Sequence, residues 1–318
     1  MFGKKNYGVI LKKVLVVLLL TIVFVVAQQA QAAFVDTYWG VRALGMGGAY
    51  TAVADDANAP LYNIAGISFA VQKEITIMGS RLFTGIEGVE IGANYLGYVH
   101  PISLNYGTLS FAWSSTSTPG LRREDTFNLG YARRLNDVIK IDEDMVEISA
   151  GLNLKYLMQE VKFDEEDKDL ASSKGAMTAD IGLLAVFNNG ISVGYSSKYL
   201  LPADIGFLET DEVKNINVVG LSYYNEELPY IKIPYFTIAL DIIFRDNESS
   251  IRAGVESYVI DGKLALRLGG REEAFNIGFG YDFAFANEMN LVIDYAFELP
   301  MQVEESYGSH FFALSFKF

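Results

Sequence analysis

The sequence has no cysteine in its 318 residues, and histidine occurs only at His100 and His310. Without thiols, the chain can form neither a disulfide framework nor a thiolate-based catalytic or metal site. Histidine is the usual general base near neutral pH, and no His-x-Ser pair shares a face of one strand. We therefore expect a protein that is not an enzyme and that holds neither a metal ion nor a cofactor.

Long hydrophobic runs are almost absent as well. The one clear run, Val14 to Ala27, is short for a transmembrane helix, which needs ~20 apolar residues. Four lysines precede it (Lys4, Lys5, Lys12 and Lys13), and the small-x-small triplet Ala30-Gln31-Ala32 follows it. This order predicts a secretory signal peptide over residues 1–32, with a membrane anchor as the less favoured alternative.

Positive charge is scarce, with 25 lysines and arginines against 39 aspartates and glutamates and a net charge of −14. Such a chain is a poor partner for nucleic acid, although acidic loops can share divalent cations with lipopolysaccharide. The acidic run 164–169 lacks the glycine and the distal glutamate of an EF-hand loop. We interpret it as a solvated loop rather than a calcium site.

Apolar residues are nevertheless abundant, at 51% of the chain, and they alternate with polar ones. Side chains of a strand alternate between its two faces, so the final segment 309–318 has one apolar and one mixed face. The apolar face carries Phe312, Leu314, Phe316 and Phe318. A strand of this kind at the end of the chain is typical of an outer-membrane β-barrel. We expect the barrel-assembly machinery to recognise this strand.

Alternation of this kind runs from Glu74 to the end of the sequence and predicts an even number of strands. The fourteen candidate strands are 74–83, 90–102, 106–116, 124–135, 146–160, 176–188, 191–200, 215–225, 234–245, 250–260, 263–272, 274–286, 289–299 and 309–318. Long connections follow odd strands and mostly short, turn-rich ones follow even strands, as in membrane barrels. The sequence therefore predicts an all-β, fourteen-stranded antiparallel transmembrane barrel over residues 73–318. A soluble exported β-protein is the alternative.

Charged residues on several strands fall on the face opposite the apolar one. A charge facing lipid costs ~2–4 kcal/mol at mid-membrane, so these side chains are expected to face the lumen. They are Asp241, Arg245, Arg252, Glu256, Arg267, Arg271, Asp282, Asp294 and Lys317. Such a row can select solutes, or it can be a ladder of paired charges that stiffens the barrel and holds an inner segment. We favour the ladder because the signs alternate.

The segment before the first strand is rich in glycine and alanine and shows no sustained alternation. Its Gly45-x-Gly47-Gly48 run follows no predicted strand, so a phosphate-binding loop is a poor interpretation. Glycines that allow close packing against a barrel wall explain the run better. We expect residues 33–72 to form a compact, small-residue segment.

Two stretches of this segment resemble the start of FadL-like outer-membrane barrels, and they look closest to the PorV-type branch. Residues 40–56 read GVRALGMGGAYTAVADD and residues 60–68 read PLYNIAGIS. Segments 265–271, 276–281, 293–297 and 309–318 fit the same pattern. The resemblance implies that residues 33–72 are a luminal hatch. Its motif residues are Gly45, Gly47, Gly48, Asp55, Asp56, Asn63 and Gly66, with Ile64 where the family usually has proline.

The resemblance implies two functions. FadL-type proteins pass hydrophobic molecules across the outer membrane by passive diffusion, whereas PorV-type proteins bind cargo of type IX secretion. We expect a monomeric outer-membrane barrel for passive transport of fatty-acid-like or aromatic small molecules, with the cargo-binding adaptor as the alternative. The short predicted outer loops weaken the fatty-acid interpretation. The expected surroundings are outer-membrane lipid and lipopolysaccharide.

Overall fold

A computed structural model describes residues 39–318 except 89, 162–171, 208, 228–233, 247, 286–288 and 304. The chain divides into two units, 1–32 and 33–318, and every described residue belongs to the second. The predicted signal peptide, the first six residues of the predicted hatch and the acidic run 164–169 lie outside the described residues. Among the residues described, no helix is long and apolar enough to span a membrane.

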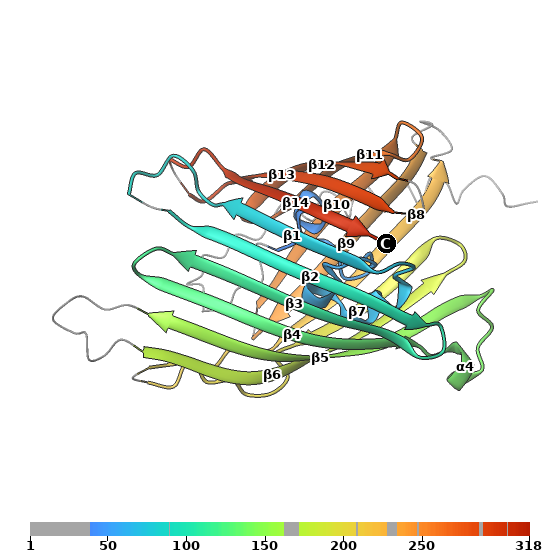
Figure 1. The fold of residues 1–318 in the computed structure, drawn as a ribbon, viewed down its shortest axis with the longest axis horizontal. Helices are drawn as coiled ribbons and strands as arrows, with labels where there is room; N and C mark the ends of the chain where they lie inside the picture. Colours follow the sequence, from blue (N-terminus) through green and yellow to red (C-terminus); the bar gives the residue numbers. More distant parts are fainter. Residues whose placement is uncertain are drawn as a thin grey trace, which may run out of the picture. The chain divides into compact units, whose positions relative to one another are not determined.

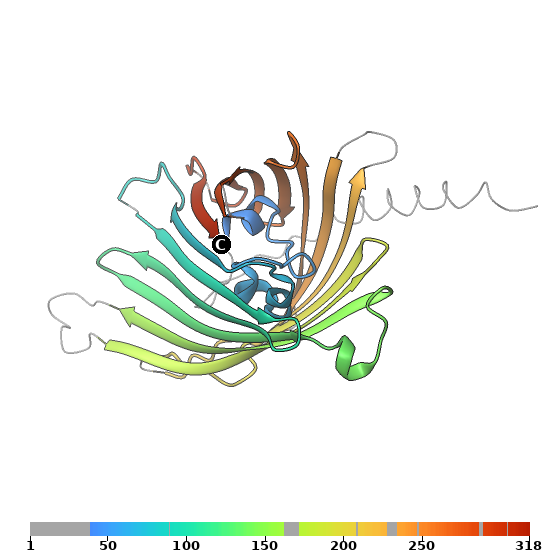
Figure 2. The same cartoon turned by 45° about the vertical axis from the view of Figure 1, so that its right-hand side comes forward.

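Fourteen antiparallel strands form a closed barrel (Figures 1 and 2). The strands are β1 Glu74–Arg81, β2 Gly92–Ser103, β3 Gly107–Thr118, β4 Arg122–Arg134, β5 Val146–Val161, β6 Ser172–Phe187, β7 Ile191–Lys198, β8 Ile216–Glu227, β9 Pro234–Arg245, β10 Glu248–Val259, β11 Leu264–Arg271, β12 Ala274–Ala284, β13 Asn290–Pro300 and β14 Ser309–Lys317. Each strand pairs with its neighbours in the sequence, and β14 closes the ring on β1 from Glu74↔Lys317 to Arg81↔His310. The predicted fold, number and order of strands are confirmed.

The alternating sequence places apolar side chains outside and small or polar ones inside. On β12, Ile277 and Phe279 are almost half exposed, whereas Asn276 between β11 and β13 is fully buried. The sequence of β8 shows no clean apolar face, yet the strand follows the same rule: Val219 and Leu221 point outward. An apolar outer surface of this extent requires an apolar environment.

The barrel has two rims, which differ in their connections. The C-terminal rim, where β1 begins and β14 ends, carries the short connections 104–106, 188–190 and 260–263. It also carries connection 135–145, with the one-turn helix α4 (Asn136–Ile139). The opposite rim carries the longer connection 199–215, but some of its other connections are as short as two residues (272–273, for example). The predicted contrast between long and short connections is therefore weaker than expected.

Residues 39–72, called the inner segment below, lie within the ring of strands, as the blue ribbon in Figure 2 shows. The segment contains helices α2 (Val41–Gly45) and α3 (Ala59–Tyr62) and the 3-10 helix η1 (Ile64–Phe69). Helix α2 contacts β11, β12 and β13, and η1 contacts β4, β5 and β6. The segment therefore bridges two opposite parts of the wall. The main hydrophobic core lies between them and includes Leu44, Met46, Tyr50, Tyr95 and Phe311.

Candidate functional site

Glycines of the wall allow the backbone of the inner segment to touch the strands. A Cβ atom added to Gly269 would lie 2.1 Å from the backbone nitrogen of Gly47. One added to Gly254 would lie 2.3 Å from the Met46 carbonyl oxygen. The inward-facing glycines with contacts of this kind are Gly97, Gly151, Gly182, Gly194, Gly220, Gly254, Gly269 and Gly278. Any side chain at these positions would push the segment away from the wall.

The predicted hatch glycines lie on the other side of these contacts. Gly47 and Gly48 have φ values of +66° and +79°, in the left-handed region that favours glycine. Gly48 lies against Arg252, and Gly45 against Arg267. A Cβ atom on Gly66 would lie 1.8 Å from the Ala54 carbonyl oxygen, so this glycine permits a contact within the segment itself.

Asn63 holds the turn that precedes η1. Its side-chain nitrogen donates to the carbonyl oxygens of Thr51 at 2.9 Å and of Leu183 at 3.0 Å. Its side-chain oxygen accepts from the backbone nitrogen of Ala65 at 3.2 Å. Ile64, at the position where the resemblance implies proline, is buried. Three hydrogen bonds from Asn63 therefore fix a turn that lacks the conformational restriction of proline.

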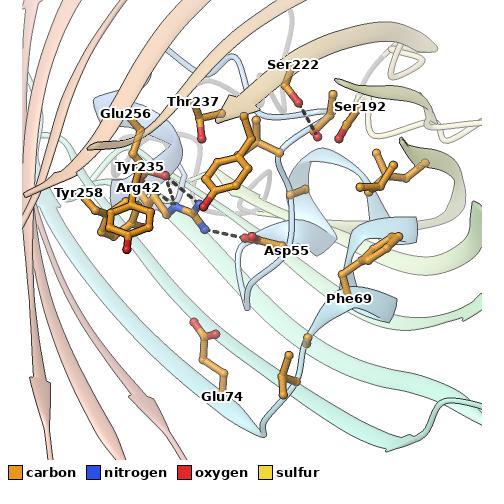
Figure 3. A pocket seen from close by; sticks show the side chains of 18 of the residues that line it. Arg42, Asp55, Phe69, Glu74, Ser192, Ser222, Tyr235, Thr237, Glu256 and Tyr258 are labelled. Carbon is orange, nitrogen blue, oxygen red and sulfur yellow. Dashed lines mark hydrogen bonds and ion pairs between the residues drawn. The ribbon is translucent and has the colours of Figure 1, made fainter. Parts of the chain in front are cut away.

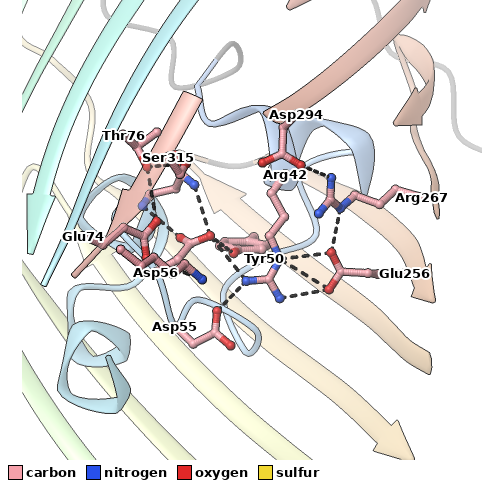
Figure 4. A network of polar contacts seen from close by, with 12 residues as sticks. Arg42, Tyr50, Asp55, Asp56, Glu74, Thr76, Glu256, Arg267, Asp294 and Ser315 are labelled. Atoms are coloured by element: carbon pink, nitrogen blue, oxygen red, sulfur yellow. Dashed lines mark hydrogen bonds and ion pairs between the residues drawn. The ribbon is translucent and has the colours of Figure 1, made fainter. Parts of the chain in front are cut away.

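A charged network joins the inner segment to the wall (Figure 4). Arg42 of α2 pairs with Asp55 at 2.6 Å, with Glu256 of β10 at 2.9 Å and with Asp56 at 3.3 Å. Arg267 of β11 also pairs with Glu256 at 2.6 Å. Arg267 pairs in addition with Asp294 of β13 at 2.6 Å. Each buried charge in this network has an opposite partner, which is the condition under which buried ions persist.

Two further contacts involve predicted lumen residues. Arg271 pairs with Glu298 of β13 at 2.7 Å. Asp241 of β9 accepts from the backbone nitrogens of Tyr50 at 3.0 Å and Thr51 at 2.9 Å. The Asp241 side chain thus binds the backbone of the inner segment. The sequence pattern does not indicate this role.

Three other predicted charges take no part in these ion pairs and backbone contacts. Lys317 is 3.9 Å from Glu74 across the β1–β14 seam. Asp282 accepts from the side chain of Asn290 at 2.8 Å, near the C-terminal rim. Arg245 lies at the end of β9, at the opposite rim. The structure therefore divides the predicted row into several groups, and Arg42, absent from that row, lies in the largest.

A cavity of about 680 Å³ lies between the inner segment and the wall at the C-terminal rim (Figure 3). The segment contributes residues 52–55 and 69–72, and strands β8 to β10 contribute Tyr224, Tyr235 and Tyr258. Gly262, in the connection that follows β10, also lines the cavity and places it at this rim. Its volume is in the range of small-molecule sites, which is roughly 300–1,000 Å³.

The cavity has apolar, aromatic and charged surfaces. Phe69, Val71, Leu184 and Val186 form the apolar part. Figure 3 shows Arg42 between Asp55 and the strand residues Glu256, Tyr235 and Tyr258. None of the three lining tyrosines is among the predicted site residues. Their inward position near a strand end could have indicated them, although for Tyr224 the sequence of β8 shows no clean apolar face.

Asp55 is the charged residue of the inner segment most open to the cavity, because half of its side-chain surface is exposed. Removal from bulk water inside the barrel raises the pKa of the Asp55 carboxyl, and the Arg42 guanidinium opposes this shift. One oxygen, Oδ1, bonds to Arg42. The other, Oδ2, has no hydrogen-bond partner among the described residues and is available to a ligand.

The two histidines lie on the outer face of the barrel, away from the cavity. His100 of β2 bonds to the Tyr98 hydroxyl at 2.9 Å, and His310 of β14 bonds to the Tyr295 hydroxyl at 2.8 Å. The His100 pair lies near the C-terminal rim, and the His310 pair lies near the opposite rim. Within the described ranges, no group of three or more histidine, aspartate or glutamate side chains is placed to hold a metal ion.

No protein-family profile and no curated protein sequence matches the chain. Solved structures match over most of its length. The Pseudomonas putida toluene transporter TodX is 12% identical, with 88% of this chain and 97% of that chain covered and a TM-score of 0.53. The monoaromatic hydrocarbon channel CymD is 12% identical, with 87% and 96% covered and a TM-score of 0.57.

A FadL homologue from Pseudomonas aeruginosa is 10% identical, with 87% of this chain and 97% of that chain covered and a TM-score of 0.55. Identities this low are informative about architecture and not about ligands. The chain has the fold of these transport barrels. The expected resemblance to FadL-like barrels is therefore confirmed at the level of the fold.

Proposed function

We propose that the protein is an outer-membrane channel for the passive diffusion of hydrophobic small molecules. The cavity between the inner segment and the wall carries this proposal, since it offers an apolar and aromatic surface inside a closed barrel. The inner segment bridges opposite parts of the wall, which suits a guided path better than a wide aqueous pore.

Aromatic solutes fit the cavity better than fatty carboxylates. Both cations that line it, Arg42 and Lys317, already face carboxylates at 2.6–3.9 Å. A fatty carboxylate would meet Asp55, Glu74 and Glu256, and no lining residue that the structure describes offers an unpaired cation to receive it. A toluene transporter and a monoaromatic hydrocarbon channel share this fold, so the architecture is compatible with aromatic solutes.

We place the barrel in a bacterial outer membrane, with its apolar face against lipid and its C-terminal rim toward the periplasm. Short connections predominate on the periplasmic side of such barrels. In this proposal residues 1–32 are a cleaved signal peptide, residues 33–72 act as the hatch, and β14 is read by the assembly machinery. The protein is a monomer in this proposal, and outer-membrane lipid and lipopolysaccharide surround it.

Transport is favoured over the PorV-type adaptor function. The compared solved structures described above are transport proteins or a homologue of one, and the cavity is the size of a small molecule rather than a protein segment.

Liposome flux tests the proposal directly. Proteoliposomes should release a toluene-sized neutral aromatic faster than empty liposomes. Thr237→Trp, which fills the cavity from β9, should lower the flux toward the rate of empty liposomes. Thr118→Trp, at the end of β3 on the opposite rim, is the matched control and should leave the flux unchanged. Equal flux from wild-type and empty liposomes would overturn the proposal.

A further inference from the structure

We propose that the cavity at the C-terminal rim prefers amphipathic organic cations, meaning an aromatic or alkyl body with one positive group, over neutral and anionic molecules of the same shape. This inference rests on the proposed transport function and names a substrate class for the same cavity. Three features of the lining carry it: its excess of carboxylates, its row of tyrosines and the free oxygen of Asp55.

The first feature is the balance of charge. Carboxylates outnumber cations in the lining, with Arg42 and Lys317 as the only cations among the described lining residues. The four carboxylates are Asp55, Glu74, Glu256 and Asp261. Both cations already face carboxylates, so the lining as a whole is electronegative. A hollow with low-dielectric walls and this balance concentrates positive solutes.

The second feature is a polar and aromatic row across three strands. Tyr224 of β8 pairs in register with Thr237 of β9, and Thr237 pairs with Glu256 of β10. Tyr235 and Tyr258 follow two residues closer to the C-terminal rim, on the same inward face. The faces of tyrosine rings attract cations, and organic cations with methylated nitrogen are the ligands that such rings recognise.

The third feature is a charged anchor across the cavity from these rings. Asp55 lies on the inner segment, opposite the strand residues in Figure 3. Its Oδ2 atom has no hydrogen-bond partner among the described residues, and its side chain is half exposed to the cavity. A positive group bound at the free Oδ2 atom would lie beside the Arg42–Asp55 pair, with the tyrosine rings along the wall of the same cavity. Phe69, Val71 and Leu184 would cover the apolar body of the ligand.

The test compares three aromatic probes of similar size. Phenyltrimethylammonium is a permanent cation, tert-butylbenzene is its neutral isostere, and benzenesulfonate is an anion. Purified full-length barrel in detergent micelles should bind the cation about tenfold more tightly than either other probe. Titration calorimetry measures the three affinities, and flux from proteoliposomes is measured in parallel. Neutral or anionic binding as tight as cation binding would overturn the inference.

Two variants locate the preference. Asp55→Asn should weaken cation binding about tenfold while affinity for tert-butylbenzene stays unchanged, because only the charge of the anchor is removed. Tyr235→Leu keeps an apolar side chain and should also reduce the cation preference. Glu90→Gln, which removes an exposed acid in connection 82–91 of the opposite rim, is the control. Cation binding that both cavity variants leave intact would refute the assignment.

The experiment also separates this inference from the transport proposal. Flux of tert-butylbenzene without any preference for the cation would retain the channel and overturn the inference. Preferential binding of the cation without flux of any probe would retain the inference and overturn the channel. Heat-dependent gel mobility checks that each variant is a folded barrel before either result is read.

Discussion

The inner surface has a region where the wall contacts the inner segment and a region where the wall lines the cavity. The two regions differ in the size of the side chains that the same strands present. On β8 the inward face reads Gly220, Ser222 and Tyr224, and on β10 it reads Gly254, Glu256 and Tyr258. Where the wall presents glycine, the backbone of the inner segment touches it. Four residues farther along these strands, toward the C-terminal rim, tyrosines line a cavity. Along these two strands, contact with the inner segment coincides with glycine, and the cavity coincides with tyrosine.

The two regions also use charge differently. In the glycine-lined region, Arg267, Glu256 and Asp294 are almost wholly buried and fully paired. At the cavity, Asp55 is half exposed and keeps one oxygen without a partner. Complete pairing favours one rigid arrangement, whereas an incomplete set of partners leaves room for a ligand. The contrast predicts that substitutions in the first region act on stability and those in the second act on transport.

The largest effect is expected from Arg267→Met, which removes the central cation of the buried network. Glu256 would keep Arg42, but Asp294 would lose its ion pair. A buried charge without its partner costs about 3–5 kcal/mol of stability. Urea unfolding in detergent micelles measures this loss. Arg81→Met, which breaks the exposed pair with Glu90, is the control and should cost at most about 1 kcal/mol. Equal losses in both variants would remove the distinction between buried and exposed charges.

A smaller loss is expected from Gly254→Ala. The new Cβ atom would lie 2.3 Å from the Met46 carbonyl oxygen, so the inner segment must shift. Overpacking of this kind costs about 1–3 kcal/mol. Gly79→Ala on the outer face of β1 is the matched control, because its Cβ atom would meet only the Asn94 side chain, at 3.7 Å. If the two alanines unfold at the same urea concentration, close packing by glycine is not what holds the segment.

A substitution in the cavity should change transport and leave stability almost unaffected. Tyr235→Ala removes a side chain that is 43% exposed, so stability should change by less than about 1 kcal/mol. Flux of neutral aromatic probes should rise, because the cavity becomes wider. Flux assays and urea unfolding on the same preparation measure both quantities. A large loss of stability without a change in flux would contradict the contrast between the two regions.

The smallest effect is expected outside the barrel wall, in connection 199–215 at the opposite rim. Lys174 and the backbone nitrogens of Asp211 and Gly206 bond to Asp204 and lower its pKa to about 2. A carboxyl whose pKa is lower when folded than unfolded, about 3.9, stabilises the structure above the unfolded pKa. That stabilisation is lost as the pH falls through about 2.

Nuclear magnetic resonance of the Asp204 carboxyl carbon measures this titration directly. Lys174→Met should move the midpoint upward, toward the ordinary range, because it removes the largest cause of the shift. A wild-type midpoint near 3.9 would show that these bonds are absent in solution. Since the carboxyl is solvent-exposed, the change concerns only this connection and leaves the two inner regions unaffected.

The sequence predicts the wall well because alternation is a local property. The exposed Ile277 and Phe279 and the buried Asn276, which precedes them, follow from a period of two residues, whatever lies beyond the strand. The same reasoning places His310 on the face with Phe312 and Leu314. Counting such segments yields the number of strands and therefore the closed ring.

Contacts across the lumen could not be predicted in this way. Arg42 and Glu256 are 214 residues apart, and nothing in either neighbourhood indicates the pair. The glycine run at 45–48 indicates close packing but does not identify Gly254 and Gly269 as the surfaces it meets. The cavity is still harder to predict from the sequence, because its position depends on where the inner segment no longer contacts the wall.

The pairing of β14 with β1 also constrains the order in which the molecule is built. The inner segment precedes every strand in the chain, and β14 is synthesised after the other thirteen. Contacts so distant in sequence form late in folding. Glycine contacts connect the segment to strands from β2 to β12, so it must be in place before the last strand closes the ring. The strands are therefore expected to close around the inner segment. A delay in placing this segment would leave an open sheet.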